Sequence, residues 1–243
     1  MKLEGKTAVV IGGGSGIGAG IALALVAEGC RTLIAGRGEP RLNETAAAWQ
    51  GKPPLLTHVV DVTDRGSVRQ LFDDARRELS QIDILVISAG TNIKTRTMAT
   101  MTAEQWDQVL AVNATGAYNC IAQVLPEMRA RRDGLIINIS SIAGKRAIQL
   151  GGVAYCASKF AMTALGTAIG NEVASDGVRV TNVYPGEVNT PILENRPVPV
   201  SEQQKAAMVQ PEDVGGLVVA IAALPPRAHV PEIIIKPTVQ GYV

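Results

Sequence analysis

The chain has 243 residues, of which 47% are hydrophobic and 19% are charged, and its formal net charge is +1. A chain of this length can bury a substantial core, and its balanced charge gives no broad field that would attract nucleic acid or an anionic membrane. No apolar run reaches the roughly 20 residues that a membrane-spanning helix needs, so we expect neither a nucleic-acid nor a membrane partner.

Short apolar runs alternate with longer helical patterns along the chain. The runs that predict strands are 7–12, 31–36, 55–62, 83–88, 134–140, 178–185 and 232–237. Helices are predicted near 16–28, 40–50, 64–79, 102–130, 153–175 and 211–223, with Asp64, Thr102 and Pro211 near the starts of three of them. Several strand runs are apolar throughout, which is expected of strands buried on both faces of a parallel sheet.

This alternation predicts an α/β fold, with an open, doubly wound sheet and helices on both faces. No linker divides the chain, so we expect a single domain over residues 1–243. The proline-containing stretch 190–204 is expected to be a long loop inside that domain.

Cysteine and histidine usage indicates a reduced, cytoplasmic protein without a metal. Cys30, Cys120 and Cys156 are widely spaced and odd in number, so neither a disulfide framework nor a zinc site is indicated. Only two histidines are present, which leaves little for a histidine-based metal site. The first residues carry glycines where a signal peptide would need an unbroken apolar core.

The first predicted strand runs into the glycine-rich sequence IGGGSGIGAG (11–20) and then into a helical pattern. Glycines allow a tight turn and let backbone N–H groups approach a pyrophosphate, while a helix N-terminus supplies positive potential. A simple strand-to-helix turn is the alternative, but the position at the start of a βαβ unit favours a dinucleotide. No lysine follows in the P-loop pattern, which argues against a nucleoside triphosphate. The loop residues expected to contact the cofactor are Gly12, Ser15, Gly16, Ile17 and Gly18.

The end of the second predicted strand distinguishes the two nicotinamide cofactors. An acidic residue there would bind the ribose hydroxyls of NAD, whereas this strand ends with Gly36 and Arg37. A guanidinium suits the 2′-phosphate of NADP by its charge and its planar set of donors. We therefore favour NADP over NAD, although Arg37 could instead be solvated or paired with Glu39.

Taken together, the chain resembles the short-chain dehydrogenase/reductase family over almost its whole length. The motifs that carry the resemblance are the glycine loop, DV at 61–62, SAG at 88–90, NATG at 113–116, SS at 140–141, YCASK at 155–159 and YPGEVNT at 184–190. The resemblance implies a Rossmann-type, seven-stranded parallel sheet and an NAD(P)-dependent interconversion of an alcohol and a carbonyl. It also implies a homo-oligomer, a dimer or a tetramer, built from the helices near 102–130 and 153–175.

The resemblance further implies roles for individual residues. The additional cofactor contacts would be Asp61 and Val62 at the adenine, Ala89 and Gly90 at the ribose, and Pro185, Gly186, Val188 and Thr190 at the nicotinamide. The catalytic residues would be Asn113, Ser141, Tyr155 and Lys159, the last two also contacting the cofactor.

The chemistry of carbonyl reduction explains why these four residue types would be needed. Reduction of a carbonyl creates an alkoxide, which needs a proton donor and stabilisation of its oxygen. Tyr155 and Lys159 are four residues apart and share a helix face, so the ammonium would lower the tyrosine pKa from its usual value of about 10. Ser141 would donate to the substrate oxygen, and Asn113 would hold a water that connects Lys159 to solvent. Each residue alone has a structural alternative, as a turn hydroxyl, a solvent-facing amide or a packing pair.

The substrate is the least readable part of the sequence. Lys94, Lys145 and Arg146 fall in segments expected to line the pocket, which would suit a carboxylate, but ordinary surface charge is the favoured interpretation. Residues 190–210 are expected to form a lid. We expect an NADP-preferring oxidoreductase of a small ketone, semialdehyde or hydroxy acid. The alternative is a non-catalytic redox sensor or scaffold that binds a dinucleotide.

Overall fold

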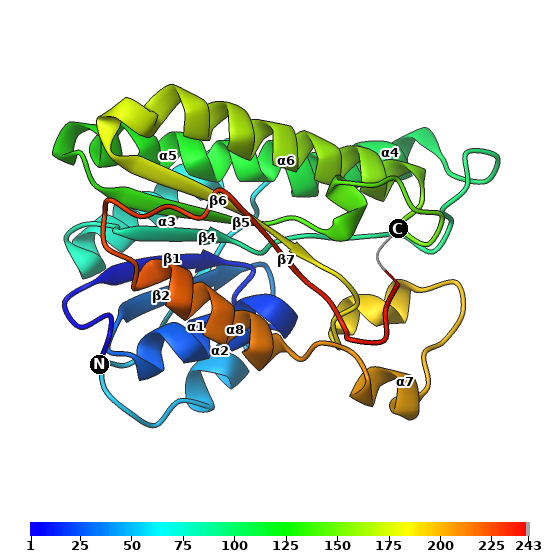
Figure 1. Cartoon of the computed structure of the whole chain (residues 1–243), viewed down its shortest axis with the longest axis horizontal. Helices are drawn as coiled ribbons and strands as arrows, with labels where there is room; N and C mark the ends of the chain where they lie inside the picture. Colours follow the sequence, from blue (N-terminus) through cyan, green and yellow to red (C-terminus); the bar gives the residue numbers. More distant parts are fainter. Residues whose placement is uncertain (242–243) are drawn as a thin grey trace.

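Seven strands form one parallel sheet in the computed structural model, which describes residues 1–241. The strands are β1 (Thr7–Ile11), β2 (Arg31–Gly36), β3 (Leu56–Val59), β4 (Ile84–Ile87), β5 (Gly134–Ile139), β6 (Val178–Pro185) and β7 (Glu232–Ile235). Their order in the sheet is β3-β2-β1-β4-β5-β6-β7 (Figure 1). The chain therefore starts in the middle, moves to one edge and returns to build the other half, so that the order reverses between β1 and β4.

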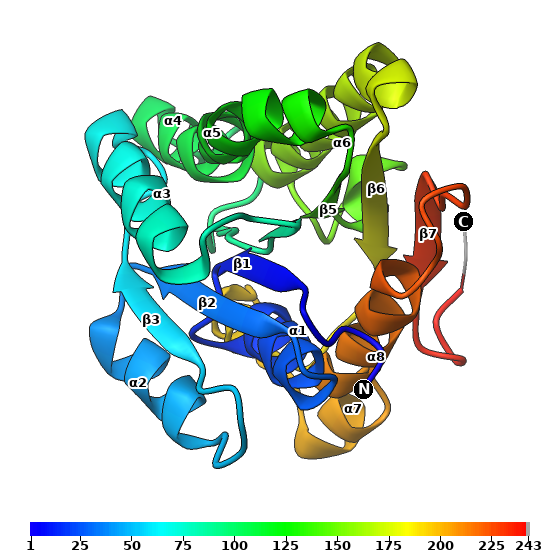
Figure 2. The same ribbon diagram turned by 90° about the vertical axis from the view of Figure 1, so that its left-hand side faces the viewer.

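Helices cover both faces of this sheet (Figure 2). One face carries α1 (Gly16–Ala27), α2 (Glu39–Ala47) and α8 (Pro211–Ala222), and the other carries α3 (Arg65–Leu79), α5 (Gly116–Arg131) and α6 (Val153–Val173). No helix within residues 1–241 is long and apolar enough to cross a membrane.

The central strands are apolar throughout because both of their faces are buried. In β1, Val9 and Ile11 belong to the core on the α3–α5–α6 side, whereas Ala8 and Val10 belong to the core on the α1–α8 side. This alternation follows from the two-residue period of a strand. The predicted α/β fold, with a doubly wound parallel sheet in a single domain, is confirmed.

The predicted helix starts are also confirmed. The Asp64 carboxylate accepts from the backbone N–H of Gly66 at 2.7 Å and caps α3. Thr102 and Gln105 cap α4 (Ala103–Leu110) reciprocally, and Pro211 is the first residue of α8. Such side-chain oxygens satisfy N–H groups that have no partner within the helix.

One prediction about the elements was confirmed with a local irregularity, and one was wrong. The segment predicted as a helix near 102–130 is helical from Ala103 to Arg131, but a π-helical turn (Ala111–Thr115) lies between α4 and α5. The stretch 190–204 is not wholly a loop, because it contains a 3₁₀ turn (Pro191–Asn195) and the start of α7 (Glu202–Ala206). Ser201 and Gln204 cap α7 reciprocally, which is a local signal that the proline-rich composition hid.

Candidate active site

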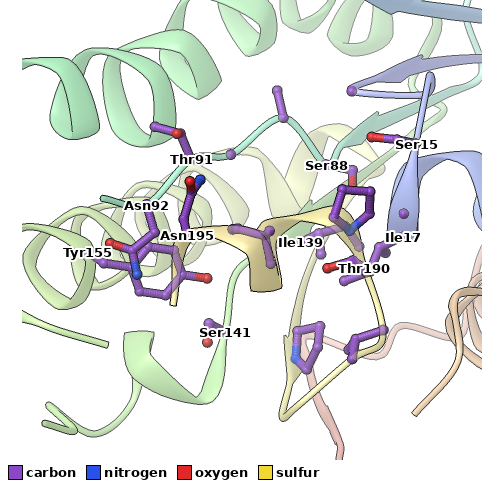
Figure 3. A pocket seen from close by; sticks show the side chains of 18 of the residues that line it. Ser15, Ile17, Ser88, Thr91, Asn92, Ile139, Ser141, Tyr155, Thr190 and Asn195 are labelled. Carbon is purple, nitrogen blue, oxygen red and sulfur yellow. The ribbon is translucent and has the colours of Figure 1, made fainter. Parts of the chain in front are cut away.

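A cavity of about 570 Å³ runs along the edge of the sheet where the parallel strands end. Its walls come from the segments that follow β1, β2, β4, β5 and β6, together with the first turns of α6. Figure 3 shows Ser15, Ile17 and Thr190 towards one end and Asn92, Asn195 and Tyr155 towards the other. The cavity is therefore elongated and suits a long ligand whose two ends meet different chemistry.

Most of the residues predicted from the sequence line this cavity. They are Gly12, Ser15, Gly16, Ile17, Arg37, Val62, Ala89, Gly90, Ser141, Tyr155, Lys159, Pro185, Gly186, Val188 and Thr190. Gly18, Asp61 and Asn113 lie outside its wall, Gly18 and Asn113 as buried residues behind it.

The glycine loop packs so closely against neighbouring backbone that a side chain would not fit at Gly12 or Gly18. Gly12 has a φ of +82°, and a Cβ there would lie 2.6 Å from the backbone nitrogen of Ala89. A Cβ on Gly18 would lie 2.1 Å from the carbonyl oxygen of Gly12, so α1 packs directly on the loop. The side chain of Ser15 makes no capping bond to α1. Uncapped N–H groups at the start of a helix form a site for an anion such as a phosphate.

Two arginines stand at the glycine-loop end of the cavity. Arg37 is exposed, and within residues 1–241 it forms no ion pair with a carboxylate, so the predicted alternative pairing with Glu39 is not observed. Arg41, which sequence reasoning missed, lies in the first turn of α2 and also lines the cavity. Its signal was its position four residues after Arg37, at the start of the helix that follows the second strand.

Asp61 follows β3 and is held by a turn. Its carboxylate accepts from the backbone N–H of Thr63 at 2.9 Å and from the Thr63 hydroxyl at 2.7 Å. These two bonds lower the pKa of Asp61, and the nearby charge of Arg37 adds to the effect. Asp61 is therefore an ionised acceptor at the cavity's border.

Tyr155, Ser141 and Lys159 meet at the other end of the cavity. The first turns of α6 place Tyr155 and Lys159 on one face, with the Lys159 Nζ 5.8 Å from the centre of the tyrosine ring. Burial raises the pKa of Tyr155, while its hydrogen bond with Ser141 and the charge of Arg96 oppose the rise. Arg96, which the sequence did not mark, is thus a cation that acts on this tyrosine, and the effect predicted for Lys159 stays a prediction.

Lys159 is only 4% exposed and points at the sheet. Its Nζ donates to the carbonyl oxygen of Ile139 at 2.8 Å. Burial lowers the pKa of Lys159 from its ordinary value of 10.5 to about 8. Lys159 therefore loses its proton, and with it its positive charge, close to neutral pH.

Asn113 sits in the π-helical turn and is fully buried. Its Nδ2 donates to the carbonyl of Thr91 at 3.0 Å and to the Ser158 hydroxyl at 2.9 Å, and its Oδ1 accepts from the Thr91 N–H at 2.8 Å. A Cβ on Gly90 would lie 3.5 Å from the Lys159 Nζ and 3.6 Å from the Asn113 Oδ1. Asn113 thus lies directly behind Lys159 and joins the segment after β4 to α6.

The segment after β6 closes the remaining side of the cavity. The backbone N–H of Gly186 donates to the carbonyl of Ile235 at 2.7 Å, which holds this segment against β7. A short parallel bridge between Val188 and Val209 ties together the two ends of the predicted lid. The start of that segment, including Leu193 and Asn195, lines the cavity.

The favoured interpretation of Lys94, Lys145 and Arg146 as surface charges agrees with the cavity wall, which the fold builds with other cations. Lys94, Lys145 and Arg146 are absent from the described cavity wall, and Lys145 pairs with Glu232 instead. Arg96 and Arg196 line the cavity in their place. No periodicity marks these two residues, because both lie on irregular segments.

Comparison with known proteins agrees with this geometry. The model of the short chain dehydrogenase family matches residues 6–199. An uncharacterised oxidoreductase of Staphylococcus saprophyticus is 34% identical over 239 residues, which cover 98% of this chain and 99% of the relative.

Two solved structures are similar over nearly the whole chain. A metagenomic short-chain oxidoreductase in complex with NADP has a TM-score of 0.83 and 29% identity, covering 99% of this chain and 100% of that one. A variant of actinorhodin polyketide ketoreductase with NADPH has a TM-score of 0.86 and 27% identity, covering 100% of this chain and 99% of that one. With the glycine loop and the Ser141, Tyr155 and Lys159 cluster in place, the chain belongs to the short-chain dehydrogenase family of oxidoreductases, as its sequence motifs predicted.

Proposed function

We propose that this protein interconverts a small alcohol and its carbonyl with NADP(H), and that Tyr155 is the general acid and base. The observation that carries the proposal is the contact of Tyr155 with Ser141, beside Lys159, at one end of the cavity. The other end is formed by the glycine loop and the uncapped start of α1.

The residues at the glycine-loop end fit a dinucleotide with a 2′-phosphate. The start of α1 would hold the pyrophosphate, and the lack of a Cβ at Gly12 leaves room for close approach. Arg37 and Arg41 would bind the 2′-phosphate, because neither is paired with a carboxylate within the described residues. Asp61 and Val62 would contact the adenine. The two neighbours solved with NADP and NADPH support the same choice.

When bound, the cofactor supplies or accepts the hydride. Tyr155 would donate its proton to the carbonyl oxygen as negative charge develops there, and Ser141 would hydrogen-bond the same oxygen. Lys159 would bind the nicotinamide ribose and stabilise the tyrosinate that remains. Asn113 would fix the geometry behind Lys159 and hold the water that returns a proton from solvent. In the oxidative direction Tyr155 would act as the base.

A panel of ketones, aldehydes and oxo acids, followed by the absorbance of NADPH, tests this function. We expect the wild type to oxidise NADPH with at least one carbonyl class. The Tyr155→Phe variant, prepared in the same way, should not oxidise NADPH with that carbonyl. The competing function is a dinucleotide-binding redox sensor. Tight NADPH binding without turnover across the whole panel would favour the sensor.

The same resemblance leads us to propose a homo-oligomer. Tyr118 on α5 and Phe160 on α6 are large apolar side chains that are 51% and 42% exposed in the single chain. Burial of such side chains against a second copy is a common reason for their exposure. Sedimentation velocity tests the proposal, and a monomer at micromolar concentration would contradict it.

A further inference from the structure

We propose that Arg96 binds a carboxylate of the substrate, so that the preferred substrates are small oxo acids and the matching hydroxy acids. The inference rests on the proposed function, because it names the substrate class of the same site. It starts from a cation that the sequence did not mark and that the fold places beside Tyr155.

Arg96 lies at the tyrosine end of the cavity. Its carbonyl oxygen accepts from the backbone N–H of Val153, the first residue of α6 and two residues before Tyr155, at 3.1 Å. Its Nη2 donates to the carbonyl of Asn195 at 2.8 Å. Asn195 and Tyr155 both line the cavity, and Figure 3 shows them towards the same end of it. Arg96 itself lines the cavity, and it lies close enough to Tyr155 for its charge to oppose the rise in the tyrosine pKa.

The guanidinium is fixed in position but is not neutralised. Its Nε donates to the carbonyl of Ile93 at 3.0 Å, its Nη1 donates to that of Leu150, and its Nη2 donates to that of Asn195. These three bonds use three of the five N–H groups of an arginine and leave two. Within residues 1–241 no carboxylate forms an ion pair with Arg96. A preorganised guanidinium with spare donors matches a planar carboxylate.

The other charged groups of this end already have partners or lie in solvent. Arg196 pairs with Glu187 at 2.6 Å. Glu194 is exposed, and Lys159 is bound to the carbonyl of Ile139. Arg96 is thus a cation in the cavity without a matching anion, and leaving a partly buried charge unpaired is costly. An anionic group on the substrate would supply the missing partner.

A carboxylate fits better than a phosphate. One guanidinium balances the single charge of a carboxylate, whereas a phosphate monoester carries nearly two charges at neutral pH. The second charge would be disfavoured by Glu187 and Glu194, which belong to the same wall. We therefore assign the site to a carboxylate, and the binding experiment below includes a phosphate ester as the competing anion.

Arg96 also connects three segments of the cavity wall, so a purely structural role must be separated from anion binding. Loss of a structural connection would slow every substrate by a similar factor. Loss of an anion site would slow only the charged substrate. The informative quantity is therefore the ratio of kcat/KM for an acid to kcat/KM for its neutral amide.

The experiment compares 3-oxobutanoate, 4-oxopentanoate and 5-oxohexanoate with their primary amides. For at least one chain length we expect the wild type to prefer the acid by roughly 10- to 100-fold, the range expected of a charge-assisted hydrogen bond. In Arg96→Gln the ratio should fall to near one. The matched control Lys94→Gln should keep the preference, because Lys94 is an exposed cation two residues from Arg96 that does not line the cavity. Equal rates for acid and amide, or an unchanged ratio in Arg96→Gln, would overturn the proposal.

A binding measurement keeps this test independent of turnover. Calorimetry on the NADPH-loaded protein compares pentanoate, pentanamide and methyl phosphate as unreactive probes. We expect pentanoate to bind at least tenfold more tightly than pentanamide, and Arg96→Gln to remove that difference. This result without turnover of any carbonyl would retain the anion site and reject the proposed function. Tighter binding of methyl phosphate than of pentanoate would overturn the carboxylate assignment.

Discussion

Replacing Lys159 by methionine should stabilise the folded protein near neutral pH while removing its activity. Burial lowers the pKa of Lys159 from 10.5 to about 8, and a lowering of this size corresponds to about 3 kcal/mol of destabilisation of the charged form. Methionine is similar in length and carries no charge. The variant loses the bond from Nζ to the carbonyl of Ile139, which removes about 1 to 2 kcal/mol. The net expectation is a gain of about 1 to 2 kcal/mol in the free energy of unfolding.

The gain should depend on pH in a defined direction. Below pH 8 both the folded and the unfolded wild type hold the Lys159 proton, so the full penalty of burial is present. Between pH 8 and 10.5 the unfolded chain binds this proton and the folded chain does not, so wild-type stability rises relative to the variant. The advantage of methionine should therefore shrink across this window and reverse above it. Buried groups distant from Lys159, such as Cys30, titrate in both proteins and cancel in the difference.

Thermal unfolding of both cofactor-free proteins at a series of pH values measures this difference. At pH 7 we expect the melting temperature of Lys159→Met to lie roughly 2 to 8 °C above that of the wild type. The reasoning would be refuted by a variant that is less stable at pH 7, or by a difference that stays constant up to pH 10.5. Turnover should be lost at every pH.

Two further predictions concern the cofactor end of the cavity. Arg37→Asp should weaken NADPH binding at least tenfold while changing NADH binding by less than threefold, because only NADPH carries the 2′-phosphate; equal losses in fluorescence titrations would exclude that role. Gly18→Ala should lower both the melting temperature and NADPH affinity, because its Cβ would meet the Gly12 carbonyl at 2.1 Å. In the matched control Gly216→Ala in α8, the new Cβ meets nothing within 4 Å, so this variant should be more stable than the wild type by about 0.5 to 1 kcal/mol. Wild-type stability and NADPH affinity in Gly18→Ala would contradict the close packing of the loop.

The fold was predictable because its signals are local. Uninterrupted apolar runs marked the buried strands, and residues such as Asp64 and Thr102 marked where helices begin. The π-helical turn between α4 and α5 was not predictable in this way. It places Asn113 where its amide bonds both Thr91 and Ser158, and these are tertiary contacts that no periodicity reveals.

The site was predictable in part for the same reason. The glycine loop and the Tyr155–Lys159 spacing are short-range patterns, and the structure brings both to one cavity. Arg96 was missed, although Lys94, two residues away, was considered. Which of these two cations faces the cavity depends on how the segment after β4 packs against the start of α6. That packing exists only in the folded chain.

The central claim is that Tyr155 supplies the proton at this site. The most direct test measures NADPH binding and turnover on one preparation of Tyr155→Phe, with an active carbonyl identified for the wild type. Loss of a general acid lowers turnover by about 10² to 10⁴, whereas removal of one hydroxyl leaves the glycine-loop end intact. The account predicts an NADPH affinity within about threefold of wild type together with such a loss of turnover, and near wild-type turnover in Tyr155→Phe would contradict it.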